Sequence, residues 1–411
     1  MSKLLASISI VTVLATVCPV AAESNFRFTF DPSATRPGFQ AVAPDVAFTA
    51  ERGFGFDLES KVELGSGCVT GNRPFFYSVA VPEGNYEVGI TFGDAKAATT
   101  NTVKAEMRRL MLERIVTRPG EFVTRTMTVN TRTPAIAGGD RVRLKQREKD
   151  SEMINWDNKL TLEFNGSRPG VAALEVSPAK APTVFLIGDS TVCDQPLEPW
   201  NSWGQMLPRF FKSGVAIANH AQSGESIKSS LGAKRFDKVF AEMKVGDWLL
   251  VQFGHNDMKD KATNALETYR VNLKKIAART REKGGTLVLV TSMERKGGIE
   301  RDTLAGYPQT VRDVAKEEGA TLIDLHAMSK VLYKALGADL DKAFQDGTHH
   351  NNYGSYELAK CIAEGIRRNK LPLAKFLADD FAGFDPAKPD PVAAFDVPES
   401  PMRSEKKPDG N

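Results

Sequence analysis

The sequence predicts an α/β protein in which a parallel sheet carries helices on both faces and is preceded by a β-sandwich. From Val184 onward, apolar runs of strand length alternate with longer segments whose apolar residues have helical spacing, which is typical of a parallel sheet wound with helices. Before residue 178 the segments are short and separated by Gly and Pro, as in antiparallel sandwiches. The 411 residues also exceed one typical domain.

The chain begins with the features of an export signal. Residues 1–3 are a short basic start, residues 4–17 are mostly apolar, and residues 20–22 are the small residues that a signal peptidase accepts. The apolar run is shorter than the ~20 residues that a bilayer-spanning helix needs. Cys18 leaves a lipoprotein signal as an alternative. We expect residues 1–22 to be removed and the protein to be secreted or periplasmic, without membrane contact after cleavage.

Residues 23–177 are expected to form the β-sandwich. Turns such as Pro82-Glu83-Gly84-Asn85 separate the expected strands. These strands are residues 25–30, 53–58, 75–81, 85–92, 108–115, 122–129, 159–164 and 170–176. The pattern resembles the galactose-binding-like sandwiches that accompany some carbohydrate esterases.

The aromatic residues of this region allow two interpretations. They could form a platform on which sugar rings stack, but rings on strands are usually buried, so we expect core packing. Whether the region binds sugar stays open. The residues are Phe54, Phe56, Phe75, Phe76, Tyr77, Tyr86 and Trp156.

The α/β region is expected to span residues 178–384, after a short linker-like stretch at 177–182. Its expected strands are 184–187, 215–218, 247–252, 287–291 and 321–325. Its expected helices begin near Ser202 and then span 235–243, 266–283, 307–318 and 353–368. Residues 385–411 are Pro-rich and charged, which predicts either a poorly ordered tail or one draped over the domain.

Composition excludes several classes of function. A net charge of +3, from 54 basic and 51 acidic residues, lacks the basic excess of a nucleic-acid binder. The mature chain keeps Cys68, Cys193 and Cys361, too few for a disulfide framework, although Cys193 and Cys361 could still pair. With five histidines and no Cys-x-x-Cys or His-Glu-x-x-His motif, we expect no metal and no other cofactor.

One strand-to-turn junction suits a nucleophile. The apolar run from Val184 to Ile187 is followed by Gly188-Asp189-Ser190, and ligands of open α/β sheets bind beyond the carboxyl ends of strands. The Gly-x-Ser-x-Gly elbow is absent, because Val192 stands where its second glycine belongs. By itself this junction is equally well an ordinary turn.

Three further segments follow in sequence order, and each carries residue types that suit the same nucleophilic chemistry. They are Asn219–Ser226 with its glycine turn, Gly254-His255-Asn256-Asp257, and Asp346-Gly347-Thr348-His349. Together with Gly188-Asp189-Ser190 they resemble the SGNH (GDSL) hydrolase family in all four blocks. Residues 189–194 and 203–205 look like its rhamnogalacturonan acetylesterase branch. The resemblance implies a flavodoxin-like sheet and a serine ester hydrolase.

The resemblance also implies a role for each residue of the site. A serine hydroxyl needs a neighbouring base, and that base needs a group that orients it. Ser190 would be the nucleophile, His349 the base and Asp346 the group that orients His349, with His350 pointing aside as a pocket wall or surface residue. The oxyanion hole would be the backbone N–H groups of Ser190 and Gly224 and the side-chain amide of Asn256.

Other residues near these motifs are expected to be structural. His255, Asp189 and Asp257 are interpreted as braces between turns, and Asp194 and Asp260 as loop caps. The branch often carries Gly-Gly-Arg where this chain has Ser223-Gly224-Glu225, so substrate contacts of that third side chain do not transfer.

We therefore expect an exported esterase that removes O-acetyl groups from plant cell-wall polysaccharide, with rhamnogalacturonan of pectin as the preferred substrate. Alternatives are acetylxylan, another carbohydrate or lipid ester, or a non-catalytic carbohydrate-binding protein. The basic residues Lys259, Lys261, Arg295 and Lys296 are expected to rim the site, either attracting an anionic polymer or forming an ordinary solvated surface.

Overall fold

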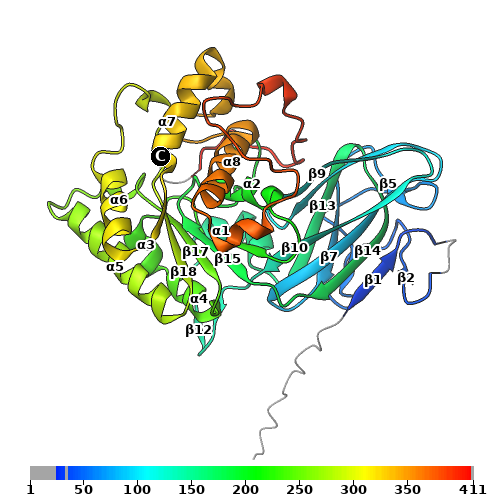
Figure 1. Cartoon of the computed structure of the whole chain (residues 1–411). Helices are drawn as coiled ribbons and strands as arrows, with labels where there is room; N and C mark the ends of the chain where they lie inside the picture. The colour runs from blue at the N-terminus through cyan, green and yellow to red at the C-terminus, as the bar shows by residue number, and fades with distance from the viewer. Residues whose placement is uncertain (1–24, 33–35, 409–411) are drawn as a thin grey trace, which may run out of the picture.

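A long twisted sheet runs through both halves of the protein in the computed structural model, which describes residues 25–32 and 36–408 (Figure 1). Its strands are β1 (Phe26–Thr29), β2 (Gln40–Ala41), β4 (Glu63–Leu64), β5 (Val69–Thr70), β7 (Gly84–Gly93), β10 (Phe122–Thr131), β14 (Gly170–Pro178), β15 (Thr183–Gly188), β16 (Ala216–Asn219), β17 (Trp248–Gln252), β18 (Thr286–Val290) and β19 (Thr321–Ile323). Their main order is β19-β18-β17-β15-β16-β10-β7-β14-β1-β2, and β5 and β4 extend from β14. The expected export signal lies outside the described residues.

The half of this sheet from β15 to β19 is parallel and carries helices on both faces. One face is covered by α2 (Trp203–Met206), α7 (Leu325–Leu336) and α8 (Asn352–Arg368). The other is covered by α3 (Ile227–Gly232), α4 (Arg235–Glu242), α5 (Ala265–Glu282) and α6 (Tyr307–Glu318). Alternate residues of β15 serve the two cores, Leu186 one and Phe185 the other, as strand geometry requires. The predicted α/β fold is confirmed.

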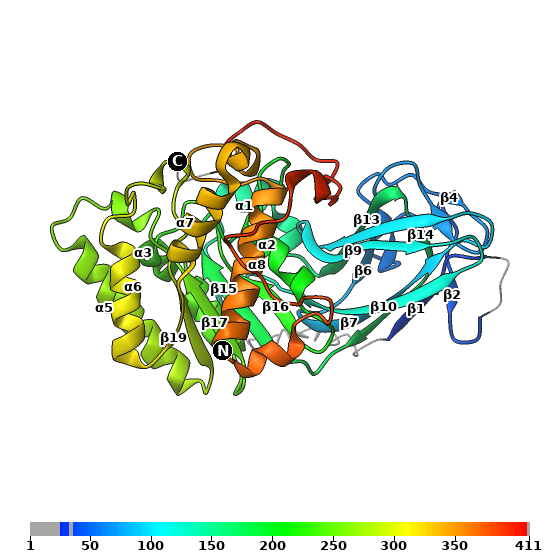
Figure 2. The same cartoon turned by 45° about the horizontal axis from the view of Figure 1, so that its top comes forward.

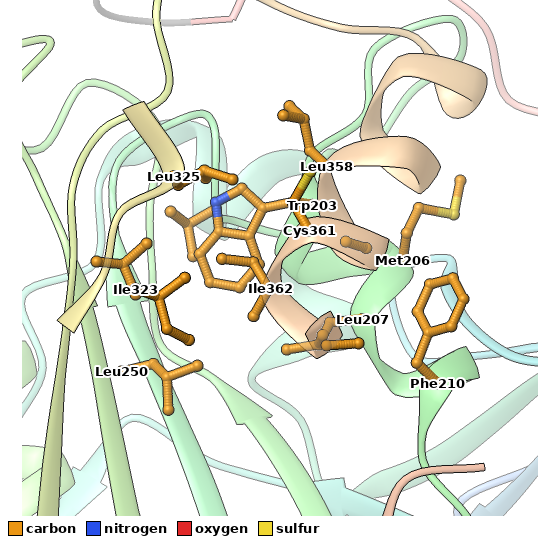
Figure 3. Close-up of a cluster of buried hydrophobic side chains, with 14 of the residues drawn as sticks. Trp203, Met206, Leu207, Phe210, Leu250, Ile323, Leu325, Leu358, Cys361 and Ile362 are labelled. Atoms are coloured by element: carbon orange, nitrogen blue, oxygen red, sulfur yellow. The ribbon is translucent and has the colours of Figure 1, made fainter. Parts of the chain in front are cut away.

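The core under α8 is dominated by the ring of Trp203 (Figure 3). Trp203 is 1% exposed, and its indole nitrogen donates a 2.8 Å hydrogen bond to Gln252 Oε1. Cys361 of α8 lies in the same core, and Cys193 is also buried; both are free thiols. The disulfide that the sequence left open is therefore not formed. Within residues 36–408, no helix is long and apolar enough to cross a bilayer.

A second, antiparallel sheet lies beside the N-terminal half of the long sheet (Figure 2). It consists of β3 (Phe54–Asp57), β6 (Phe75–Ala80), β13 (Lys159–Arg168), β8 (Thr99–Ala105) and β9 (Arg109–Thr117), hydrogen-bonded in that order. The two layers enclose one apolar core. An antiparallel β region before the α/β region, as predicted, is confirmed.

The aromatic residues of this region fill its interior and do not form a stacking surface. Phe56, Phe75 and Tyr77 lie in the core between the layers, where their rings contact one another edge to face. Trp156 lies in a small separate cluster and is 3% exposed. Phe54 is partly buried against the main core. Core packing was therefore the correct interpretation.

The two halves of the molecule are joined through the backbone. β10 and β16 run parallel and meet at Val129 and Ile217, so the antiparallel and parallel parts belong to one sheet. Buried Arg109 reinforces the seam by donating to Asn130 O at 3.1 Å and to Ile217 O at 3.2 Å. The proposed division at residues 177/178 falls at the C-terminal end of β14, before its last residue, and stays a prediction.

The C-terminal segment is draped over both halves and is drawn in red in Figure 1. Lys104 of β8 donates to Pro398 O at 2.7 Å, and Asn165 of β13 donates to Glu399 O at 2.9 Å. Further along, the indole of Trp200 donates to Ser404 O at 3.1 Å. Of the two expected states of the tail, the structure shows the draped one up to residue 408.

Candidate active site

Ser190 lies in the turn that follows β15. The carboxylate of Asp189 shapes this turn, since Oδ1 accepts hydrogen bonds from Thr191 N at 2.9 Å and Thr191 Oγ1 at 2.7 Å. Gly188 ends the strand where a side chain would not fit, because a Cβ there would lie 2.6 Å from Gln252 O. Ser190 itself is 4% exposed. The predicted strand-to-turn junction thus holds the hydroxyl at the carboxyl end of the parallel sheet.

The loop before α8 brings Asp346 and His349 to Ser190. Asp346 Oδ1 accepts from the N–H groups of Thr348 and His349, each at 2.7 Å, which folds the loop tightly. Asp346 Oδ2 is 3.0 Å from His349 Nδ1, and His349 Nε2 is 2.8 Å from Ser190 Oγ. Burial would raise the pKa of Asp346, but the hydrogen bonds from His349 hold it well below its usual range. The carboxylate is therefore ionised and faces the imidazole.

His350 lies away from this chain of contacts. Its Nε2 is 2.9 Å from Tyr333 Oη, and its ring packs against Phe344 with centroids 4.0 Å apart. Burial, together with the nearby His349 and His255, lowers the pKa of His350 to about 3, so it stays neutral near pH 7. The sequence placed His350 on a pocket wall or the surface; instead it is a 2% exposed core residue, because Tyr333 supplies the partner that its ring requires.

The three predicted oxyanion donors lie in turns at the same edge of the sheet. Among the described residues, the backbone N–H groups of Ser190 and Gly224 form no hydrogen bond. Gly224 has φ +74°, a conformation that favours glycine. Asn256 Nδ2 donates to Glu225 O at 3.0 Å, which occupies one of the two N–H bonds of this amide. Backbone and amide donors therefore remain for a ligand.

The residues interpreted as braces do brace the turns. His255 Nε2 is 3.1 Å from Met293 O, and its Nδ1 is 3.4 Å from Asp189 Oδ2. Asp257 Oδ1 accepts from Ile227 N at 2.9 Å. Asp260 caps its loop by accepting from Ala262 N at 3.0 Å.

Asp194 is not the loop cap that the sequence suggested. It is 3% exposed, lies 3.4 Å from Arg109 Nε and accepts from Asn219 Nδ2 at 2.8 Å. The ion pair joins the loop after Ser190 to the N-terminal β region. No local sequence pattern predicts this ion pair, because Arg109 lies far from Asp194 in the sequence.

The four basic residues expected at the rim divide into two groups. Lys259 and Lys261 are exposed, and Lys259 Nζ donates to Asn256 Oδ1 at 3.0 Å. Arg295 instead donates to Thr303 O at 3.2 Å, and Lys296 forms an ion pair with Asp341 at 2.6 Å. Of the four, only Lys259 is an exposed cation bonded to a residue of the predicted oxyanion hole.

One cluster has the residue types of a metal site. Single ligand atoms of Glu294, Asp302 and His326 lie within 4.8 Å of one another. However, Glu294 is already bonded to His326 Nε2 at 3.1 Å and to Thr303 N at 3.2 Å, and Asp302 pairs with Lys330 at 3.0 Å. These groups satisfy one another, so we derive no metal function from them.

A hollow that the sequence did not predict adjoins the serine. Its walls contact the site directly: Gln195 Nε2 donates to Ser190 O at 2.7 Å, and the ring of Trp200 lies edge-on to His349 with centroids 5.9 Å apart. The hollow is lined by Arg147, Ser151, Gln195, Pro196, Leu197, Trp200, Lys406, Lys407 and Pro408. The N-terminal region, the loop after Ser190 and the C-terminal segment all contribute to it.

The chain is similar in sequence to known esterases. Residues 186–355 match the model of the GDSL-like lipase/acylhydrolase family. The chain is 39% identical over 217 residues to rhamnogalacturonan acetylesterase RhgT of Bacillus subtilis, a match covering 47% of this chain and 93% of that protein. It is 23% identical over 373 residues to the uncharacterized esterase YxiM of the same organism, covering 84% of this chain and 91% of that protein. A crystal structure of the acetylxylan esterase Axe2 from Geobacillus stearothermophilus superposes with TM-score 0.36 at 20% identity, over 45% of this chain and 94% of Axe2.

Proposed function

Because this chain belongs to the GDSL-like lipase/acylhydrolase family, we propose that it is an exported serine esterase that removes O-acetyl groups from plant cell-wall polysaccharide, with rhamnogalacturonan of pectin as the preferred substrate. The observation that carries the proposal is the continuous contact from Asp346 through His349 to Ser190 Oγ. A hydroxyl, an imidazole and a carboxylate in this order form the machinery of acyl transfer.

In the proposed reaction, Ser190 Oγ attacks the acetyl carbonyl carbon while His349 Nε2 takes the hydroxyl proton. Asp346 accepts from Nδ1, which fixes the ring and stabilises the imidazolium that forms. The carbonyl oxygen becomes an oxyanion that accepts from the N–H groups of Ser190 and Gly224 and from the Asn256 amide. His349 then returns the proton to the sugar oxygen as its bond to the acetyl carbon breaks.

In the second half of the cycle, water takes the place of Ser190 as the nucleophile and Ser190 becomes the leaving group. Water loses a proton to His349 Nε2 and attacks the acetyl-serine carbonyl, and the same donors hold the second oxyanion. Collapse of this intermediate breaks the bond to Ser190 Oγ, which takes the proton from His349, and releases acetic acid, which ionises to acetate in solution.

The substrate assignment draws on the name of the 39% identical relative and on the surroundings of the serine. The hollow beside Trp200 adjoins the serine, so parts of a substrate beyond the acetyl group can lie against its walls. Arg147, Lys406 and Lys407 lie on its walls, and cations there favour an acidic polysaccharide over a neutral one. Export, proposed from residues 1–22, would place the enzyme where such polymers occur.

The test is acetate release from acetylated rhamnogalacturonan, homogalacturonan and xylan, together with p-nitrophenyl acetate, using Ser190→Ala as the control. We expect the highest kcat/KM on rhamnogalacturonan and a loss of at least about 10³-fold in the variant on every substrate. Preference for xylan would move the protein to the acetylxylan alternative. No acetate from any substrate would leave the non-catalytic alternative.

A further inference from the structure

Lys145 reaches the predicted oxyanion hole from the N-terminal β region. It directly precedes α1 (Gln146–Ser151), outside the residues that match the family model. Its Nζ donates a 2.6 Å hydrogen bond to Ser223 O and lies 3.0 Å from Glu225 Oε1. The carbonyl of Ser223 and the N–H of Gly224 belong to one peptide group. A cation is thus bonded to the acceptor end of the peptide whose donor end is left for the substrate.

The position of this lysine is fixed by buried groups. Lys145 N donates to Glu148 Oε2 at 2.8 Å, and Glu148 also accepts from Trp156 Nε1 at 3.1 Å and Arg235 at 2.5 Å. Glu225, the second partner of the ammonium, is 2% exposed. The ammonium therefore lies between fixed partners, although the lysine side chain keeps 31% of its surface exposed.

The Gly224 turn is held from several sides. Glu225 O accepts from the Asn256 amide at 3.0 Å, while Glu152 Oε2, again from the N-terminal region, accepts from Gln222 Nε2 at 2.8 Å. Glu225 directly follows Gly224, and its buried carboxylate lies 3.0 Å from Lys145 Nζ and 3.8 Å from Arg235 Nε. Lys145 and Glu225 thus form an ion pair beside the Gly224 turn.

We propose that Lys145 is a positioning residue that orients and polarises the Ser223–Gly224 peptide, so that the Gly224 N–H becomes a stronger donor to the oxyanion. Hydrogen bonds to charged donors are stronger than neutral ones, and a peptide whose carbonyl accepts such a bond becomes a better donor at its N–H. The effect should be largest in the transition state, where the oxyanion carries charge. The inference rests on the proposed esterase function and gives the N-terminal region a part in the chemical step.

The experiment compares full-length wild type with Lys145→Met, Lys145→Arg and the matched control Lys149→Met, which removes an exposed ammonium from α1, the helix that Lys145 precedes. On p-nitrophenyl acetate we expect Lys145→Met to lower kcat about 10- to 100-fold with KM within about twofold, as for loss of a transition-state interaction. Lys145→Arg should restore a large part of kcat, and Lys149→Met should behave as wild type.

A second measurement distinguishes a positioning role of Lys145 from an effect on the stability of the fold. A boronic acid that adds to Ser190 mimics the oxyanion, so its affinity should fall in parallel with kcat/KM in Lys145→Met, while the melting temperature and acetate inhibition stay near wild type. Unchanged kcat in Lys145→Met would overturn the inference, as would a kcat loss without weaker boronate binding. If Lys145→Met does not fold, Lys145→Gln is read by the same criteria. Absence of Ser190-dependent hydrolysis in wild type would instead refute the proposed function itself.

Discussion

The α/β region and the N-terminal β region contribute to the site in opposite ways. In the α/β region one polar pair of the site lies within a single loop: Asp346 and His349 are three residues apart. In the β region the matching is across the molecule: Arg108 donates to Trp200 O at 3.1 Å and to Asn352 Oδ1 at 3.4 Å, partners 92 and 244 residues away. The comparison teaches that only the pairing of Asp346 with His349 is local in sequence, whereas the contact of His349 with Ser190, 159 residues away, and the contacts from the β region are long-range.

Buried charge follows the same division. Arg108 is 4% exposed and lies 2.5 Å from Glu198, which is fully buried in the loop that carries Trp200. Burial would raise the pKa of Glu198, but Arg108 and Lys104 lower it, so this carboxylate stays ionised inside the interface. The β region thus places cations against a loop whose ring touches His349.

The largest effect should distinguish the two adjacent histidines. His349→Ala should lower kcat on an acetyl ester by at least about 10³-fold, because it removes the proposed base. His350→Ala should stay within about tenfold in kcat, and its cost should appear in the melting temperature, because it empties a buried site and leaves Tyr333 Oη without its partner. Steady-state kinetics and thermal unfolding of both variants decide this, and the reverse result would reassign the base.

The next effect tests the long-range side of the comparison. Arg108→Met should reduce the free energy of unfolding by about 3–5 kcal/mol, because it leaves Glu198 buried with less compensation. Adding Glu198→Gln to the Arg108→Met variant should recover part of the lost free energy of unfolding. Arg114→Met is the control: its ion pair with Asp396 has side chains that are 64% and 70% exposed, so it should change stability by less than about 0.5 kcal/mol. Equal effects of Arg108→Met and Arg114→Met in urea titrations would break the comparison.

A smaller effect is expected at the amide donor. Asn256→Ala should lower kcat by about 10²–10³-fold while KM changes little, because an oxyanion donor acts in the transition state. Asn256→Asp is the matched variant, of similar size but without the donor. A change confined to KM in either variant would make Asn256 a substrate contact.

The smallest effect concerns the exposed cations. Lys406→Glu combined with Lys407→Glu should raise KM severalfold on acetylated rhamnogalacturonan fragments at low salt, and added salt should shrink the difference. The control is the double variant Lys275→Glu and Lys283→Glu, on α5 and its C-terminal cap. It has the same net charge as the double variant at Lys406 and Lys407. Hydrolysis of p-nitrophenyl acetate should be unaffected in both. If the variant at Lys406 and Lys407 lost as much activity on p-nitrophenyl acetate as on the polymer fragments, the argument for an acidic polymer as substrate would be removed.

Sequence reasoning succeeded where structure and chemistry share a short stretch. The strand and turn before Ser190 and the loop of Asp346 and His349 carry their own signals, since strand pattern, turn residues and spacing are all local. The structure brings Ser190, His349 and Asp346 into contact, an arrangement that only the family resemblance implied for Ser190. Gly224 also has the positive φ that a glycine turn suggested.

The parts that the sequence did not predict depend on tertiary partners. β8, with the sequence TTNTVKA, lacks apolar alternation, because Asn101 and Lys104 are buried in polar contacts with distant strands and the C-terminal segment. α7 begins at Leu325, which the pattern assigned to the preceding strand; Asp324 ends that strand by capping the helix. Lys145 and Arg108 carried no signal, because their partners follow 78 and 87 or more residues later.

The seam between β10 and β16 has a consequence for anyone who would express the α/β region alone. In the intact chain β16 is an interior strand, flanked by β15 on one side and β10 on the other. A version beginning at Thr183 would turn β16 into an edge strand with unpaired N–H and C=O groups, and such edges recruit strands from neighbouring molecules. The apolar side chains Ile217 and Ala218 lie along that edge. Self-association would therefore accompany the shortened protein unless the edge were redesigned with a charge or a proline.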